Sequence, residues 1–369
     1  MTTKFYYIDD DPNSQNKVQG FENEDLDIVA MQHKDSWEEE FSFLNDEKDQ
    51  FDGIILDLKL DDLPNSNGKR ADFRGTSLAQ EIRTRQKEGS MNSFPIILFS
   101  ANDKTQQALE NSGKDLFDIL INKSMLDDIA FSRFTPQLID LSDGYKRLTD
   151  SSLAIINEVL QIDEMILDSR FVGEYNKNKE CPVHIQSRFL ITEFLTKQGL
   201  VIDEDVLAAR LGIDKSNSDD WPNLLKRLSE AKYQGVFCNG WPRWWMQLVE
   251  QWWTETIKAE TFLRSTPAAE RVEKIKEVTE LPGLVAAKKI DKSESDEFWT
   301  VCKGFGQPLD PIDGMLIQGQ DNLYSWQEPE YVSIEAALWR KNIDNWVSVA
   351  DIEKEKYENL KVLYSRKKQ

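Results

Sequence analysis

Five polar residues in the first third of the chain follow four short apolar runs. They are Asp9, Asp10, Asp57, Ser100 and Lys123, and the runs cover 5–8, 53–56, 96–99 and 118–122. Such runs are typical of the buried parallel strands of an α/β sheet. Ligands bind beyond the carboxyl ends of these strands, near the point where the strand order reverses. We therefore expect the five side chains to converge on one edge of a sheet.

The residue types indicate phosphoryl transfer. The carboxylates of Asp9, Asp10 and Asp57 would repel one another at close range, and a hard divalent cation such as Mg²⁺ relieves that repulsion. One carboxylate can then attack phosphorus and form an aspartyl-phosphate. The Lys123 ammonium and the Ser100 hydroxyl can hold the phosphoryl oxygens.

Residues 1 to about 148 resemble the receiver domain of two-component response regulators. That family has an acidic pair after strand 1, Asp after strand 3, Thr or Ser followed by Ala after strand 4, and Lys after strand 5. The matching residues here are Asp9-Asp10, Asp57, Ser100-Ala101 and Lys123. The resemblance implies a flavodoxin-like fold, which is a doubly wound five-stranded parallel sheet. It also implies that Ser100 is the switch hydroxyl and Lys123 the cation that pairs with the phosphate.

The same resemblance implies a phosphoacceptor and a metal site. Asp57 would accept the phosphoryl group from a histidine kinase or a phosphotransfer protein. Asp10 and Asp57 would ligate Mg²⁺ with the backbone carbonyl of Lys59, and Asp9 would assist. A receiver that has lost phosphorylation is the alternative interpretation.

The sequence departs from the family pattern at several places. Ser124 follows Lys123 where the family has a proline with a cis peptide bond, and a cis bond before a non-proline residue costs about 2.5–4 kcal/mol, so we expect a trans bond. Leu120 replaces an aromatic switch residue. The segment 61–74 is long and rich in turn-forming residues, which predicts a loop over the mouth of the pocket or a tolerated surface insertion. The first helix, after Pro12, is expected to be short and polar.

Composition limits the class of protein. The 369 residues, with 40% hydrophobic and 30% charged side chains, support two or three domains. No apolar run approaches the length of a transmembrane helix, and the N-terminus leads directly into the first strand, which predicts no signal peptide. The three cysteines, an odd number widely spaced, indicate reduced thiols in a cytoplasmic protein.

The charge balance argues against nucleic acid as a partner. Residues 1–150 hold 30 acidic and 17 basic side chains, a balance of −13, and the remaining residues supply the other −8 of the net −21. Neither part has the basic excess that binding to a phosphate backbone requires.

The second part, residues 149–369, is predicted to be mainly helical. Helices are expected at Ser151 to about Phe171, around 189–195, and over Asp203–Leu211, Trp221–Ala231, Ala268–Glu280, Ser333–Ile343 and Ile352–Tyr364. Pro136 is expected to open the last helix of the receiver. Residues 281–330 are rich in Gly, Pro and Asp, which favours irregular structure or short strands and a possible subdivision there. We match this part to no family.

Two features of the second part leave its output open. Residues 201–213 resemble the first half of a helix-turn-helix, but the connection 214–220 is long and acidic, which favours a packed helical hairpin over DNA binding. Aromatic and apolar residues between Trp241 and Trp253 lie on one face of a predicted helix, which forms core or an interface with a protein partner or dimer mate.

The output hypothesis follows from these features. We expect a phospho-accepting regulator that acts through protein contacts and is not an enzyme, because no nucleophile–base pair or metal cluster follows residue 150. A DNA-binding transcriptional regulator and a phosphate sink without direct output remain the alternatives.

Overall fold

The computed structural model describes residues 2–101, 113, 115–150, 155–163, 167–339 and 348–366. The chain divides into two compact units. The first contains 1–192 and 234–241, and the second contains 193–233 and 242–369. The sequence predicts a division at 148/149, whereas the first compact unit runs on to Thr192. Helix α8 (Val183–Arg188) packs on α5 (Asp128–Thr149), which joins these later residues to the first unit.

The first unit contains one parallel sheet of five strands, in the order β2-β1-β3-β4-β5. The strands are β1 (Thr3–Ile8), β2 (Leu26–Met31), β3 (Gly53–Leu56), β4 (Ile96–Ser100) and β5 (Ile119–Asn122). This is the doubly wound flavodoxin-like order, in which the direction of strand addition reverses between β1 and β3. The predicted fold class is therefore confirmed.

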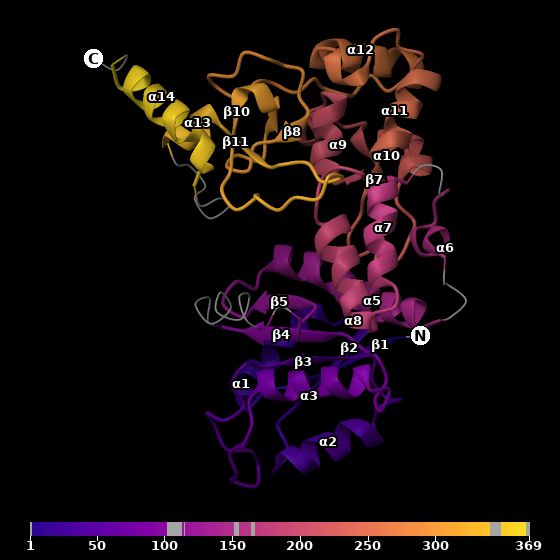
Figure 1. Cartoon of the computed structure of the whole chain (residues 1–369), viewed down its shortest axis with the longest axis vertical. Coiled ribbons are helices and arrows are strands. Elements are labelled where there is room, and N and C mark those ends of the chain that lie inside the picture. The colour runs from indigo at the N-terminus through magenta and orange to yellow at the C-terminus, as the bar shows by residue number, and fades with distance from the viewer. Residues whose placement is uncertain are drawn as a thin grey trace. The chain divides into compact units, whose positions relative to one another are not determined.

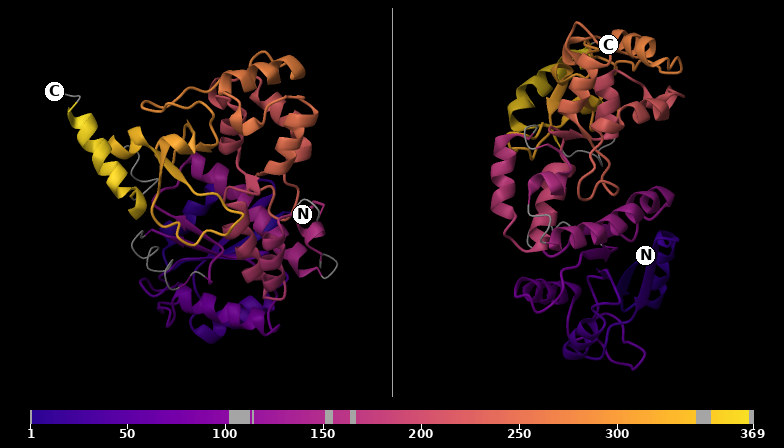
Figure 2. Two further views of the ribbon diagram at one scale, coloured as in Figure 1. Left: turned by 45° about the horizontal axis from the view of Figure 1, so that its top comes forward. Right: turned by 90° about the vertical axis from the view of Figure 1, so that its right-hand side faces the viewer.

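Helices cover both faces of this sheet (Figures 1 and 2). Helices α2 (Trp37–Asp46) and α3 (Gly75–Lys87) pack on one face, where their apolar side chains join those of β1, β3 and β4 in one core cluster. On the other face, α5 packs against a 3₁₀ helix over Asn16–Phe21, which follows α1 (Pro12–Gln15). The first helical segment is thus short, as predicted.

Helix α5 begins earlier than the sequence suggests. The Asp127 side chain accepts a hydrogen bond from the Ala130 N–H at 2.7 Å and caps the helix. Pro136 consequently lies inside the helix and does not open it, so that prediction is wrong. A buried stripe on α5 outweighs the one helical hydrogen bond that a proline removes.

Three shorter helices follow in the first unit, namely α6 (Ile156–Leu160), α7 (Ser169–Asn178) and α8. The single helix predicted from Ser151 to Phe171 is wrong where the structure describes it. Gln161 ends α6 in the left-handed conformation, with φ of 52°. Residues 151–154 and 164–166 of that prediction lie outside the described residues.

The second unit is mainly helical, as predicted. A π-helical segment at Phe189–Leu195 begins in the first unit and ends in the second. The α-helices that follow are α9 (Glu204–Leu211), α10 (Trp221–Arg227), α11 (Met246–Glu255), α12 (Ala268–Thr279), α13 (Ile334–Trp339) and α14 (Lys354–Arg366). The short strands are β6 (Val201–Ile202), β7 (Trp244–Trp245), β8 (Thr300–Val301), β9 (Pro308–Leu309), β10 (Gly314–Leu316) and β11 (Tyr331–Ser333). The strands form antiparallel pairs. Residues 340–343 of the predicted helix after Ser333 lie outside the described residues.

Local signals in the sequence set the ends of α9. The Asp203 side chain accepts from the Val206 N–H at 2.8 Å, and Gly212 ends the helix with φ of 73°. All side chains from Val206 to Leu211 are buried. This helix is therefore a core element of the second unit, as the packed-hairpin interpretation expects.

The tryptophan-rich segment is mostly core, although only part of it is helical. Trp244 and Trp245 form β7, which pairs with β6, and the helix begins at Met246. Trp244, Trp245 and Trp253 are buried, whereas Trp252 is only partly buried against the same core. None of the described helices combines the length and the apolarity that crossing a membrane requires.

Candidate functional site

Three of the predicted site residues meet at the point where the strand order reverses. Asp9 and Asp10 follow β1, and Asp57 follows the adjacent β3, whose Leu56 is paired with Ile8. Carboxylate oxygens of these three residues all lie within 4.8 Å of one another. No other group of three or more His, Cys, Asp or Glu side chains this close occurs among the described residues.

Lys123 joins two of these carboxylates. Its ammonium nitrogen lies 2.5 Å from Asp9 Oδ2 and 2.5 Å from Asp57 Oδ1. Lys123 follows β5, and its backbone N–H donates to the carbonyl of Ser100 at the end of β4. Ser100 is buried and lines the same pocket, of about 390 Å³. The structure thus brings all five strand-end residues to one place.

Burial sets the electrostatics of two carboxyl groups. Removal from water raises the pKa of Asp57, and the positive charge of Lys123 opposes this rise. Burial also raises the pKa of Asp10, opposed by a hydrogen bond from the Leu63 N–H. A divalent cation would favour the ionised form of both groups. Three clustered oxygen donors with one ammonium beside them therefore fit a hard cation.

Lys59, the expected backbone ligand, lines this pocket. Its N–H donates to Asp57 Oδ2 at 2.8 Å, which fixes the orientation of that carboxylate. The Lys123–Ser124 peptide bond is trans as predicted, because the described residues contain no cis peptide bond. Leu120 is partly buried and packs against the core of the sheet.

Tyr7 is a site residue that the sequence interpretation missed. Its hydroxyl donates to Asp9 Oδ2, and burial followed by the negative charge of Asp9 raises the pKa of the tyrosine. Side chains two residues apart on a strand lie on the same face. The available signal was therefore the position of Tyr7, two residues before Asp9 in the same apolar run.

The long loop after Asp57 reaches the pocket, as one of the two interpretations predicted. Asp62 and Leu63 line it, and the Leu63 N–H donates to Asp10 Oδ2 at 2.5 Å. The loop therefore supplies a backbone donor directly to one of the three clustered carboxylates.

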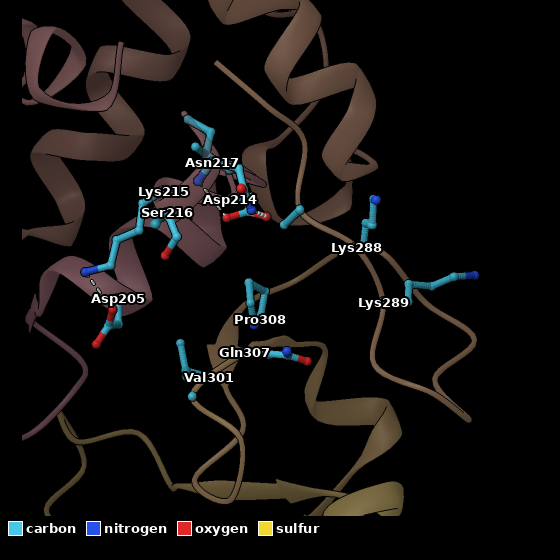
Figure 3. A pocket seen from close by; sticks show the side chains of 14 residues that line it. Asp205, Asp214, Lys215, Ser216, Asn217, Lys288, Lys289, Val301, Gln307 and Pro308 are labelled. Carbon is cyan, nitrogen blue, oxygen red and sulfur yellow. Dashed lines mark hydrogen bonds and ion pairs between the residues drawn. The ribbon is translucent and has the colours of Figure 1, made fainter. Parts of the chain in front are cut away.

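The second unit has a separate pocket of about 510 Å³ beside α9 (Figure 3). Lys215 forms an ion pair with Asp205 at 2.7 Å, and Asp214 accepts from the Asn217 N–H. Lys288 and Lys289 point outward in Figure 3. Lys215, Asp205 and Asp214 thus bond to other residues of the pocket lining.

Comparisons with known proteins bear on the first part of the chain. No protein-family model matches the chain, and no curated protein matches it. Among solved structures, it is similar to the response regulatory domain of protein mrkE from Klebsiella pneumoniae, with 18% identity, a TM-score of 0.28, and coverage of 39% of this chain and 99% of that chain. It is also similar to the BeF3-activated DrrB receiver domain, with 22% identity, a TM-score of 0.25, and coverage of 36% and 95%. For the Mn(2+)-bound form of response regulator Rcp1, the identity is 16%, the TM-score 0.26, and the coverage 35% and 87%.

Proposed function

We propose that this chain is a response regulator that accepts a phosphoryl group on Asp57. The observation that carries the proposal is the cluster of three carboxylates at the β1/β3 switch point, with Lys123 within 2.5 Å of two of them. The donor would be a histidine kinase or a phosphotransfer protein. A carboxylate oxygen of Asp57 attacks phosphorus, an O–P bond forms, and the bond from phosphorus to the donor nitrogen breaks.

Each residue has a task in this proposal. Asp10, Asp57 and the Lys59 carbonyl would hold Mg²⁺, which neutralises charge on the phosphoryl oxygens when bound. Asp9 stays fixed by Tyr7 and Lys123. The Lys123 ammonium turns from Asp57 to the transferred phosphoryl group, and the Ser100 hydroxyl bonds one of its oxygens. Acceptance and loss of this group are the only chemistry that we propose for the chain.

Helix α5 gives the proposed signal a route to the rest of the chain. On α5, Tyr145 donates to Asp118 at 2.5 Å, and Asp118 immediately precedes β5, the strand that leads to Lys123. Asp140, also on α5, accepts from the N–H groups of Asn239 and Gly240. The segment 234–241 interrupts the sequence of the second unit but belongs to the first. We infer that phosphorylation acts through this segment on a helical domain that binds a protein partner or a second copy.

Labelling of the full-length protein tests the proposal. Incubation with acetyl phosphate and Mg²⁺ should add one phosphoryl group to the intact protein, and Asp57→Asn should abolish the addition. Asp62→Asn is the matched control, because Asp62 lines the same pocket outside the group of three. Labelling of Asp57→Asn at the wild-type level would refute the assignment.

A further inference from the structure

The loop after β3 is held in place by one buried asparagine. Asn65 is 7% exposed, and its side chain uses both its donors and its acceptor. Oδ1 accepts from the N–H groups of Asn67 and Lys69 at 3.0 and 3.1 Å. Nδ2 donates to Asp35 Oδ1 at 2.7 Å and to the carbonyl of His33 at 3.3 Å. Asn65 therefore shapes its own loop and ties it to the connection between β2 and α2.

We call Asn65 and Asp35, which are joined by this hydrogen bond, the clasp. Asp35 also holds other side chains of the loop. Besides Asn65, it accepts from Asn67 Nδ2 at 3.0 Å and pairs with Lys69 Nζ at 3.1 Å. These donors lower the pKa of Asp35 to about 2. Asp35 is thus ionised at neutral pH and holds three side chains of the loop at once.

The clasp lies two residues from the donor to Asp10. The Leu63 N–H bonds Asp10 Oδ2, and a backbone hydrogen bond from Asp62 also favours the Asp10 carboxylate. Both donors belong to the loop. Asp9 and Asp57 depend on other donors, since each bonds Lys123 and a backbone N–H close to itself in sequence.

We propose that Asn65 and Asp35 are positioning residues, which keep the Asp10 carboxylate in the orientation that binds the metal. The inference rests on the proposed function. Asp10 is buried beside two other carboxylates, and the Leu63 N–H of the loop, 2.5 Å from Asp10 Oδ2, sets the orientation of the Asp10 carboxylate. Without the clasp, the loop gains conformational freedom and presents that N–H group less often. Loss of the clasp therefore weakens metal binding while every metal ligand is still present.

Mg²⁺ titration of the full chain by calorimetry tests the inference. Asn65→Ala and Asp35→Ala should each raise the Mg²⁺ dissociation constant by about tenfold, in the range typical of outer-shell partners of a metal site. The double variant should be little worse than either single variant, because both act through one loop. Asn67→Ala is the matched control and should stay within about twofold, because it keeps the Asn65–Asp35 bond and the Asn67 N–H.

Labelling with acetyl phosphate separates positioning from a general structural defect. The variants should need about tenfold more Mg²⁺ for half-maximal labelling, yet reach the wild-type level at saturating Mg²⁺. If Asn65→Ala does not fold, Asp35→Ala carries the test from the other side of the clasp. Unchanged Mg²⁺ affinity, or lower labelling at saturation, would overturn the inference and leave the proposed function standing. A wild-type protein that neither binds Mg²⁺ nor labels would overturn both.

Discussion

Replacement of Asp140 tests how the segment 234–241 is held on α5. The Asp140 side chain is 5% exposed, and one of its oxygens, Oδ2, accepts from the Asn239 N–H at 2.9 Å and from the Gly240 N–H at 2.7 Å. Asp140→Ala removes the acceptor from both groups. Asp140→Asn keeps one acceptor oxygen for the two N–H groups, removes the charge, and replaces Oδ1, which lies 3.5 Å from Asn239 Nδ2, with an NH2 group, which makes it the matched control.

The expected cost follows from the surroundings of the two N–H groups. Gly240 is buried, and a buried donor left without a partner costs about 1–3 kcal/mol. Asn239 is exposed, so water can replace part of its bond. We therefore expect Asp140→Ala to lower the free energy of unfolding by about 2–3 kcal/mol. Burial raises the pKa of Asp140, so its charge is not what stabilises the fold, and Asp140→Asn should stay within about 1 kcal/mol of wild type.

Urea unfolding of the full chain measures these differences in the free energy of unfolding. The dependence of that free energy on urea concentration should have the same slope in all variants. Hydrogen exchange at the amides of 239 and 240 gives a local measure, and it should accelerate in Asp140→Ala while Asp140→Asn remains close to wild type. Equal destabilisation by Ala and Asn would refute the reasoning, because the charge and not the acceptor would then hold the segment. Unchanged exchange in Asp140→Ala would show that Asp140 does not hold the segment.

Two further predictions concern other parts of the chain. Trp253 is 1% exposed and donates to the Thr261 carbonyl, so Trp253→Ala should lower the free energy of unfolding by about 3–5 kcal/mol. Trp252 is only partly buried, so Trp252→Ala should cost less than half of that. Equal losses of unfolding free energy for the two variants in urea would contradict this. Burial, with the nearby positive charges of Arg83 and Lys87, lowers the pKa of His184 to about 4. As the pH falls below about 6.5, the unfolded chain therefore binds a proton at this histidine that the folded chain does not bind. Between pH 7 and pH 4.5, the free energy of unfolding of wild type should fall by about 1 kcal/mol more than that of His184→Gln, after allowance for solvent screening. Parallel curves of unfolding free energy against pH for the two proteins would contradict this.

The strand-end residues were predictable because parallel strands place consecutive endings at one edge of a sheet. Asp9, Asp57 and Lys123 are far apart in sequence, yet each directly follows a buried strand, and strand pairing alone brings them together. The flavodoxin-like strand order was expected only from the resemblance to receiver domains, because the periodicity of single segments predicts strands but not their order in the sheet.

Helix ends followed the sequence only where the capping residue dominated. Asp203 and Gly212 set α9 as predicted. At the tryptophan segment, the helical period suggested a start at Trp241, but pairing of β7 with β6 keeps Trp244 and Trp245 extended. A two-residue strand has too little pattern to be read from sequence, so tertiary pairing overrode the local signal.

The contact between α5 and the segment 234–241 shows what such patterns omit. Gly144 on α5 faces Phe237, and a Cβ at Gly144 would lie 2.0 Å from Cε1 of that ring. Phe237 is fully buried and has φ of 67°, a conformation that costs a non-glycine residue about 1–3 kcal/mol. Only surrounding contacts can hold it there, among them Asp140, which bonds Gly240 across 100 residues of sequence. A glycine within a helix and a strained phenylalanine are uninformative separately. Together they define a close fit between α5 and the segment 234–241, whereas the residues on both sides of that segment in the sequence belong to the second unit.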